Sequence, residues 1–315
     1  MIRLTVIQCN NRTGFHCYCC HGKRNTITNK GVIIDIIPSK FEMQARANQV
    51  RNLGKTIAFV PTMGYLHDGH LSLMRLAKNM ADTLVVSIFV NPTQFGPGED
   101  LAAYPRNFDR DISLCRNEKV DILFYPDVAE MYTPRFQTFI SLDQLPLHLC
   151  GISRPVHFRG VATVVTKLFH IVKPHTALFG QKDYQQVRII RQLVQDLDMD
   201  IQIITGPTVR EPDGLAMSSR NAYLNAFQRP SALSLYKALC QTQKFLETGL
   251  TDAPALIQNA VTLIQSFPDT AIDYIAICDP DTLEDMQTID RPAVMALAVK
   301  VGKTRLIDNM LLSPP

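Results

Sequence analysis

Two histidines and two glycines fall within one short stretch, residues 61–70, which reads PTMGYLHDGH. An apolar run at 56–60 precedes it and has the composition of a buried strand, and apolar residues at 71–77 follow it at helical spacing. If a helix begins near His67, then His67 and His70 lie on one face of its first turn, because residues three apart are neighbours on a helix. The stretch therefore places two imidazoles at the start of a helix that follows a strand.

The start of a helix is a place where anions bind. Its first backbone N–H groups lack partners within the helix, and the helix dipole is positive there. Gly64 and Gly69 have no side chains, so phosphate oxygens can approach the backbone, and imidazoles can donate hydrogen bonds to phosphate or transfer a proton. We therefore predict a nucleotide site. The alternative is that the histidines cap the helix and the glycines only turn the chain.

Gln94 follows another apolar run, Thr83 to Val90. Asn91-Pro92 ends that run, so Gln94 is expected on a loop at the carboxyl end of a strand, where ligands of open α/β sheets bind. A glutamine there can both donate and accept hydrogen bonds, which suits a substrate with hydroxyl and carboxylate groups. The alternative is a loop glutamine that bonds its own backbone.

A second strand-turn-helix pattern lies at 178–193, LFGQKDYQQVRIIRQL. Gly180 is expected at the turn, and Lys182 would supply a positive charge to a triphosphate. Gln186 lies four residues further along the same expected helical face and is predicted to reach a second substrate. Asp183 is expected to cap the helix or to hold Lys182 rather than to act as a base.

Two hydroxyls and a guanidinium stand in a row at Ser218, Ser219 and Arg220, after the turn at 212–214. A guanidinium matches phosphate oxygens, and the hydroxyls can bond the remaining ones. Taken alone, such a segment is also compatible with a solvated loop. The block at 157–174 has a helical apolar stripe, and Arg159 near its start is expected at the surface or at an interface, with a ligand role as the less favoured alternative.

The HxGH pattern after a first strand resembles the signature of the nucleotidylyltransferase superfamily, whose members bind ATP and attack its α-phosphate. From about Val32 to the C-terminus, the blocks are similar in order and separation to those of the pantothenate synthetase family, which joins pantoate to β-alanine. The 217–220 block resembles the mobile basic loop of related nucleotide-activating enzymes. The family commonly has Glu at the position of Gln181, a change that leaves the resemblance intact.

The resemblance implies a set of binding residues. Pantoate is expected to contact Gln94 and Gln186, and β-alanine is expected to contact Gln94. The residues expected to contact ATP are Met63, Gly64, Tyr65, Leu66, His67, Asp68, Gly69, His70, Gly180, Gln181, Lys182, Asp183, Val209, Met217, Ser218, Ser219 and Arg220.

The reaction implied by the resemblance activates a carboxylate. Pantoate attacks the α-phosphorus of ATP, pyrophosphate leaves, and β-alanine then displaces AMP from the acyl adenylate. His67 and His70 are expected at the phosphates, with His70 protonating or stabilising the departing group, while Lys182 and the 218–220 block balance the charge. Mg²⁺ is expected with the triphosphate, with protein ligands that the sequence does not identify. No covalent enzyme intermediate is required.

Strand patterns alternate with helical patterns before residue 207, which predicts a Rossmann-like parallel sheet with helices on both faces. We place the domains at 32–207, for ATP and pantoate, and 208–315, a smaller α+β lid, preceded by an extension at 1–31. The chain has no apolar run long enough to span a membrane, so a cytoplasmic protein is expected. The family resemblance implies a homodimer, and the alternating apolar residues of 131–145 resemble an interface strand.

Residues 1–31 differ from the rest of the chain. They carry a charge of +5, so by subtraction from the total of +3 the remainder carries −2, and the charge gives no support for a nucleic-acid partner. A zinc site or a disulfide framework is not favoured, because neither the cysteine spacing nor the rest of the chain fits one. A transit peptide is an alternative to a non-functional extension, which we expect to be dispensable. The cysteines concerned are Cys9, Cys17, Cys19 and Cys20.

Two other functions compete with this interpretation. An adenylyltransferase that leaves AMP on its product would share His67, His70 and a basic loop, but would not need Gln94 and Gln186 around an amine-accepting pocket. A non-catalytic nucleotide-binding protein would bind ATP without releasing pyrophosphate. A class I aminoacyl-tRNA synthetase is disfavoured, because no part of the chain is left to bind tRNA.

Overall fold

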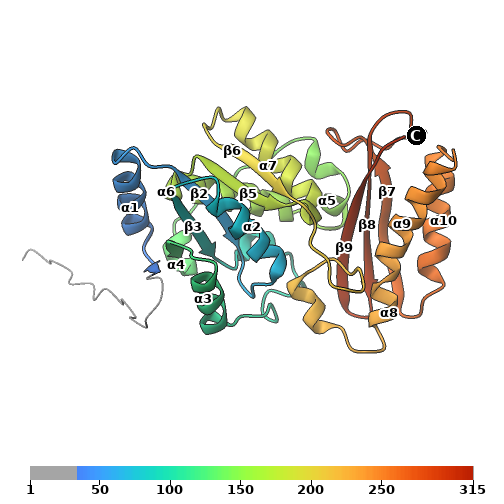
Figure 1. Cartoon of the computed structure of the whole chain (residues 1–315), viewed down its shortest axis with the longest axis horizontal. Coiled ribbons are helices and arrows are strands. Elements are labelled where there is room, and N and C mark those ends of the chain that lie inside the picture. The colour runs from blue at the N-terminus through green and yellow to red at the C-terminus, as the bar shows by residue number, and fades with distance from the viewer. Residues whose placement is uncertain (1–33, 315) are drawn as a thin grey trace, which may run out of the picture.

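Residues 34–314 are described by the computed structural model, in which a parallel sheet is followed by a smaller antiparallel sheet (Figure 1). The expectations for residues 1–31 lie outside these described residues. The parallel sheet has the strand order β1-β4-β3-β2-β5-β6. Its strands are β1 (Asp35–Ile37), β2 (Ile57–Thr62), β3 (Thr83–Ile88), β4 (Ile122–Phe124), β5 (Thr176–Gly180) and β6 (Gln202–Gly206).

The helices that accompany this sheet connect its strands. They are α1 (Lys40–Asn52), α2 (Asp68–Lys78), α3 (Phe108–Asn117), α4 (Val128–Met131), α5 (Cys150–Ser153), α6 (His157–Val172) and α7 (Tyr184–Asp196). Three short 3-10 turns, η1 (Pro92–Gln94), η2 (Leu145–Leu147) and η3 (Gln181–Asp183), lie in the loops. None of the helices within 34–314 is long and apolar enough to cross a membrane.

Helices cover both faces of the parallel sheet, as expected. Ile57 and Phe59 of β2 belong to the buried cluster that includes α1, α6 and α7, whereas Ala58 and Val60 belong to the cluster that includes α2 and α3. Neighbouring residues of one strand thus pack against opposite layers, because successive side chains point to opposite faces. The Rossmann-like arrangement is confirmed.

Strand β2 ends two residues later than the apolar run suggested. Pro61 lies opposite Ser87 of β3, but β5 pairs with β2 only at Ala58 and Phe59. A proline, which has no N–H, is tolerated there because that end of the strand is paired on one side only. The extension carries β2 directly into the HxGH segment.

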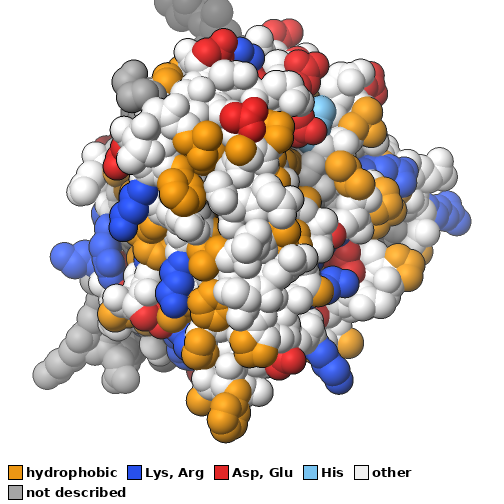
Figure 2. Space-filling model, turned by 90° about the vertical axis from the view of Figure 1, so that its right-hand side faces the viewer, with side chains coloured by type: hydrophobic (Ala, Val, Ile, Leu, Met, Phe, Trp, Pro, Cys, Tyr) orange, Lys and Arg blue, Asp and Glu red, His pale blue; other side chains and the backbone are white. Residues whose placement is uncertain are grey.

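The C-terminal part packs helices on one face of a three-stranded antiparallel sheet, and α9 and α10 lie at the outer edge of the molecule (Figure 1). On the face shown in Figure 2, hydrophobic side chains are interspersed with charged and other polar ones. The elements are η4 (Ser219–Tyr223), α8 (Arg229–Ala232), α9 (Ser234–Glu247), α10 (Ala253–Gln265), β7 (Thr270–Cys278), β8 (Ala293–Val301) and β9 (Thr304–Leu312). The parallel sheet ends at Gly206, and the boundary at residue 207 stays a prediction.

No strand forms at 131–145 among the described residues, and the expected place of this segment at an interface stays a prediction. Residues 132–144 have neither helix nor strand, and they run along α6. Lys167 lies over the ring of Phe136 at 4.9 Å, and Arg159 lies over the ring of Phe139 at 4.0 Å. Two of the alternating aromatic residues thus contact cationic side chains of α6.

Candidate active site

The two histidines of the HxGH segment lie together at the start of α2. His67 is the N-cap residue, and the centroids of the two imidazole rings are 4.0 Å apart. The backbone N–H of His67 donates a hydrogen bond to Nδ1 of His70, at 3.3 Å. Since Nδ1 accepts, the proton of a neutral His70 ring lies on Nε2.

Both imidazoles are uncharged at neutral pH. Burial, together with the positive charge of Lys182, lowers the pKa of His67 to about 4. Burial, then the neighbouring His67 and Lys182, lowers the pKa of His70 well below its usual value. A neutral imidazole can donate a hydrogen bond to a phosphate oxygen, but unlike the protonated ring it does not act as a general acid.

A carboxylate on α3 holds the loop that leads into these histidines. Asp111 is 2% exposed and accepts hydrogen bonds from the backbone N–H groups of Tyr65, at 2.7 Å, and Leu66, at 2.8 Å. Gly64 and Tyr65 both have positive φ, of 82° and 50°, which Gly adopts readily but Tyr does not. Asp111 therefore stabilises a backbone conformation that the loop would not favour alone.

One cavity of about 640 Å³ gathers most of the residues expected to bind substrates. It is lined by Met63, His67, Gly69, His70, Gln94, Gly180, Lys182, Asp183, Gln186, Val209, Met217, Ser218, Ser219 and Arg220. Gly64, Tyr65, Leu66, Asp68 and Gln181 do not line it. The ATP contacts of those five stay predictions, and Leu66 is fully buried.

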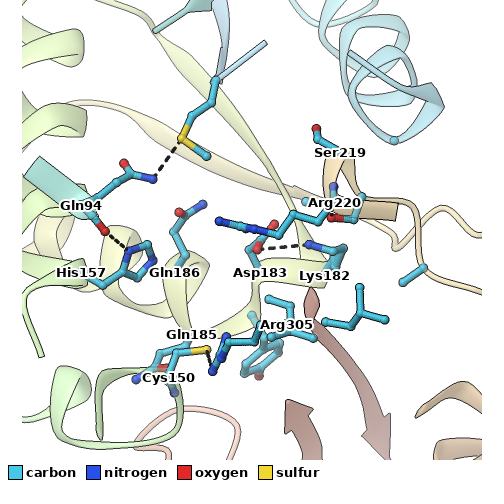
Figure 3. Close-up of a pocket in the computed structure, with 18 of the residues that line it drawn as sticks. Gln94, Cys150, His157, Lys182, Asp183, Gln185, Gln186, Ser219, Arg220 and Arg305 are labelled. Atoms are coloured by element: carbon cyan, nitrogen blue, oxygen red, sulfur yellow. Dashed lines mark hydrogen bonds and ion pairs between the residues drawn. The ribbon is translucent and has the colours of Figure 1, made fainter. Parts of the chain in front are cut away.

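Lys182 lies in the turn η3, before α7 begins, so the expectation that Lys182 and Gln186 share one helical face is wrong. Both nevertheless line the cavity, and Figure 3 shows Gln186, Arg220 and Lys182 around one space. Nζ of Lys182 lies 3.4 Å from Oδ1 of Asp183, which makes no helix-capping hydrogen bond. Of the two roles expected for Asp183, holding Lys182 is the one that the geometry favours.

The Ser218–Arg220 segment contacts two loops of the first part of the chain. Oγ of Ser219 donates a hydrogen bond to the carbonyl of Tyr65, at 3.2 Å. Arg220 donates two hydrogen bonds to the carboxylate of Asp100, at 2.8 and 2.9 Å. A guanidinium and the HxGH loop are thereby brought to one side of the cavity, although they are far apart in the sequence.

Gln94 is buried in η1, with 7% of its surface exposed. Its Nε2 donates to Sδ of Met63 at 3.2 Å, and its backbone carbonyl accepts from Nδ1 of His157 at 2.9 Å (Figure 3). Burial, then the charge of Arg154, lowers the pKa of His157 to about 4. His157 and Arg154 both line the cavity, whereas Arg159 is exposed and does not.

Sequence reasoning missed Asp111, His157 and Arg154. His157 opens the block at 157–174, whose pattern predicts an apolar helix, and Arg154 lies three residues before it, so polar residues next to that apolar stripe were the available signal. Asp111 gave no such signal, because a carboxylate in an amphipathic helix usually faces solvent. In residues 34–314, no three His, Cys, Asp or Glu side chains are grouped to hold a metal ion.

Comparison with known proteins agrees with this geometry. Residues 35–311 match the family model described as pantoate-beta-alanine ligase. The chain is 58% identical over 281 residues to the pantothenate synthetase of Desulfatibacillum aliphaticivorans, an alignment that covers 89% of this chain and all of that protein. It is 53% identical to the pantothenate synthetase of Thermotoga petrophila, covering 88% of this chain and 99% of that protein.

The chain belongs to the pantoate-beta-alanine ligase family. Solved structures of family members have the same fold. Pantothenate synthetase from Thermus thermophilus is 40% identical, with a TM-score of 0.84 over 89% of this chain and 99% of that one. Pantoate-beta-alanine ligase from Francisella tularensis, complexed with beta-gamma ATP and beta-alanine, is 35% identical, with a TM-score of 0.74 over 88% of this chain and 97% of that one.

Proposed function

We propose that this chain condenses pantoate with β-alanine at the expense of ATP, giving pantothenate, AMP and pyrophosphate, a step of pantothenate and coenzyme A biosynthesis. The proposal rests on one cavity in which His67, His70 and Lys182 lie with Gln94 and Gln186. The first three side chains suit phosphates, and the two amides suit a hydroxy acid. The Francisella ligase structure, which contains beta-gamma ATP and beta-alanine, supports the same substrates.

In the first step, a carboxylate oxygen of pantoate attacks the α-phosphorus, and the bond from that phosphorus to the bridging oxygen of pyrophosphate breaks. Negative charge grows on the leaving oxygens, so fixed donors should contribute more than proton transfer. Nε2–H of His70 would donate to a phosphate oxygen, and Lys182 would lie beside the departing charge. Because both imidazoles are neutral, we assign His70 to hydrogen-bond donation and not to protonation.

Arg220 would change partners when ATP binds. It is paired with Asp100 through two hydrogen bonds, and both residues line the cavity. A triphosphate carries more negative charge than one carboxylate, so it would compete for the guanidinium. The segment 217–220 would then close on the phosphates, with Ser218 and Ser219 as further donors.

In the second step, the amine of β-alanine attacks the acyl carbon, the bond from that carbon to the phosphate oxygen of AMP breaks, and the amine loses a proton. Gln94 lies on the side of the cavity where Gln186 also projects, and both would position the pantoyl group (Figure 3). Gln94 would also contact β-alanine. The chemistry needs no covalent bond to the protein.

Mg²⁺ would enter with ATP and would be held mainly by phosphate oxygens and water, as this ion usually is. Asp183 and Asp100 are carboxylates that line the same cavity and could take part. The ion would supply positive charge to the phosphates. We further propose a cytoplasmic homodimer, with residues 208–315 acting as the lid over ATP.

The proposal is tested by mixing the protein with Mg-ATP and pantoate and measuring pyrophosphate before and after β-alanine is added. Pyrophosphate should appear with pantoate alone, up to one equivalent per site, and should turn over continuously once β-alanine is present. A protein that only binds nucleotide would release none. Absence of pantoate-dependent pyrophosphate would reject the proposed reaction.

A further inference from the structure

Asn91 makes every hydrogen bond that its side chain can make. It is 1% exposed and follows β3. Its Oδ1 accepts from the hydroxyl of Tyr132 at 2.8 Å and from the hydroxyl of Thr93 at 2.9 Å. Its Nδ2 donates to the carbonyl of Gly160 and to Oε1 of Gln94, both at 3.1 Å.

This network determines where Oδ1 and Nδ2 of the Asn91 side-chain amide lie. A side-chain amide can be turned over with little change of shape, so its orientation is decided by its partners. The carbonyl of Gly160 can only accept, and two hydroxyls are available to donate to the opposite end. Turning Asn91 over would place its oxygen against that carbonyl, which is repulsive. Oδ1 must therefore face Tyr132 and Thr93.

The orientation of Asn91 in turn fixes Gln94. Because Asn91 donates, Gln94 must present Oε1 to it, which leaves Nε2 as the end that faces Met63 and the cavity. The sulfur of Met63 is a weak acceptor, so Nε2 can exchange it for an oxygen of a substrate at little cost. Gln94 is thus oriented as a donor toward the cavity before any substrate binds.

We propose that the hydroxyls of Tyr132 and Thr93 are positioning groups for the pantoate site, because through Asn91 they hold the amide of Gln94 with its N–H groups toward the substrate. Neither hydroxyl-bearing residue lines the cavity. The substrate group that faces Gln94 is accordingly an acceptor, a carboxylate or hydroxyl oxygen. This inference rests on the proposed function and adds to it which end of Gln94 meets pantoate.

Tyr132 is well suited to a fixed role. Its ring packs edge-on against Phe136, with centroids 4.9 Å apart, and lies near Phe89, at 6.2 Å. Burial raises the pKa of Tyr132, so the hydroxyl keeps its proton and stays a donor through the neutral range. Tyr132→Phe would leave this packing in place and would remove only the hydroxyl.

The test compares Tyr132→Phe, Thr93→Val and the double variant, each made in the wild-type chain and in a Gln94→Ala chain. In the wild-type chain, we expect the double variant to lower kcat/KM for pantoate by about tenfold, with smaller losses in each single variant, the scale of one or two neutral hydrogen bonds. The KM for ATP should change by less than about twofold, because no phosphate contact is touched.

The decisive readout is the double-mutant cycle. In the Gln94→Ala chain, loss of the hydroxyls should have no further effect, because the amide through which they act is gone. If loss of the hydroxyls lowers kcat/KM for pantoate by the same factor in the wild-type and the Gln94→Ala chains, the hydroxyls matter only for folding and the inference is overturned. A change in the KM for ATP as large as the change for pantoate would overturn it as well. If the double variant does not fold, the same cycle can be measured with each single hydroxyl variant.

Thr166→Val is the matched control, since it removes a buried hydroxyl of α6 that bonds the carbonyl of Ala162 within its own helix. It should leave the kinetics for pantoate unchanged.

The wild-type protein separates the two proposals. If it releases no pyrophosphate with pantoate, the proposed function fails, whereas if it does so and the cycle is additive, only the role of Tyr132 and Thr93 fails.

Discussion

Burial keeps the imidazoles of His67 and His70 uncharged, and their state decides which chemistry each can do. The pKa of His67 is lowered to about 4 by burial and then by Lys182, so at neutral pH the ring is a donor and not an acid. Each neutral ring keeps one N–H group, which a phosphate oxygen can accept.

His70→Ala should lower turnover by about a hundredfold or more, the scale of a positioned oxyanion donor. His70→Gln is the matched variant, because a Gln amide can donate from a position close to Nε2. It should keep more activity than His70→Ala. Steady-state pyrophosphate release with saturating pantoate measures both, and a loss below about threefold in His70→Ala would reject the role.

Acid should destabilise the protein partly through His157. Its pKa is about 4 in the folded chain, lowered by burial and then by Arg154, against about 6.5 when unfolded. Between these values the unfolded state binds more protons, so stability falls as pH drops from about 6.5 toward 4, by up to about 1.4 kcal/mol per pH unit for this group. Above pH 6.5 the contribution is constant.

Urea unfolding of His157→Gln at pH 7 and pH 5 measures this effect. The difference in unfolding free energy between the two pH values should be smaller than in the wild-type protein by about 1 to 2 kcal/mol. His170→Gln, which changes an exposed histidine on the same helix, is the control. An unchanged pH dependence in His157→Gln would contradict the prediction.

The elements around the HxGH segment act together on one loop. β2 leads into residues 64–66, α2 begins directly after them, and α3 supplies the carboxylate that accepts two of their backbone N–H groups. A side chain added at Gly64 would lie 2.9 Å from Ile88 and 3.1 Å from Asp111, so the loop is also tightly packed. The histidines are thus positioned by three elements at once.

Asp111→Asn should loosen this loop. An amide offers one acceptor and adds N–H groups next to backbone N–H donors, so at least one hydrogen bond is lost in a buried place. We expect kcat/KM for ATP to fall about tenfold or more and stability to fall by about 1 to 3 kcal/mol. Asp109→Asn, on the exposed side of α3, is the control. Equal kinetics in the two variants would show that the loop holds its shape without Asp111.

At the scale of the whole molecule, the C-terminal sheet joins the two halves of the site. Residues of β8 alternate, since Val294 and Ala296 belong to the core of the parallel-sheet part, while Met295 and Leu297 belong to the core under α9 and α10. Next to β8, the strand β9 contributes Asn309, 4% exposed. Its Nδ2 donates to the carbonyls of Gln181 and Lys182, at 3.0 and 2.8 Å.

Asp308, the residue before Asn309, binds Arg210 with two hydrogen bonds at 2.6 and 2.9 Å. Arg210 in turn pairs with Ala216, which lies shortly before the Ser218–Arg220 segment. Of two adjacent residues of β9, Asn309 thus contacts the Lys182 turn directly, and Asp308 holds Arg210 next to the segment that leads to Ser218.

Asn309→Leu should raise the KM for ATP by about tenfold, because it leaves two carbonyls of the Lys182 turn without their donor while it keeps the branching of the side chain. The KM for pantoate should change less. Asn52→Leu, at the exposed end of α1, is the control for adding an apolar side chain. An unchanged KM for ATP, in a variant whose thermal unfolding is also unchanged, would show that η3 is positioned by its own contacts.

The sequence alone was sufficient for the local parts of this site. The strand-turn-helix around His67 and His70, the amphipathic helices, the alternation that predicts a parallel sheet and the resemblance carried by four blocks all depend on residues close together in the chain. Local spacing also misled, because the alternating residues of 131–145 lie along a helix and Lys182 precedes its helix.

Only the tertiary structure decided how these parts are held. Asp111 and Tyr65 are 46 residues apart in the chain, and Asn309 and Gln181 are 128 apart. Such contacts depend on which side chains meet once the sheets have packed, and no periodicity records that. The HxGH segment could thus be found in the sequence, but the neutral state of its histidines, the carboxylate that holds its loop and the orientation of Gln94 follow from burial and from partners that the fold brings together.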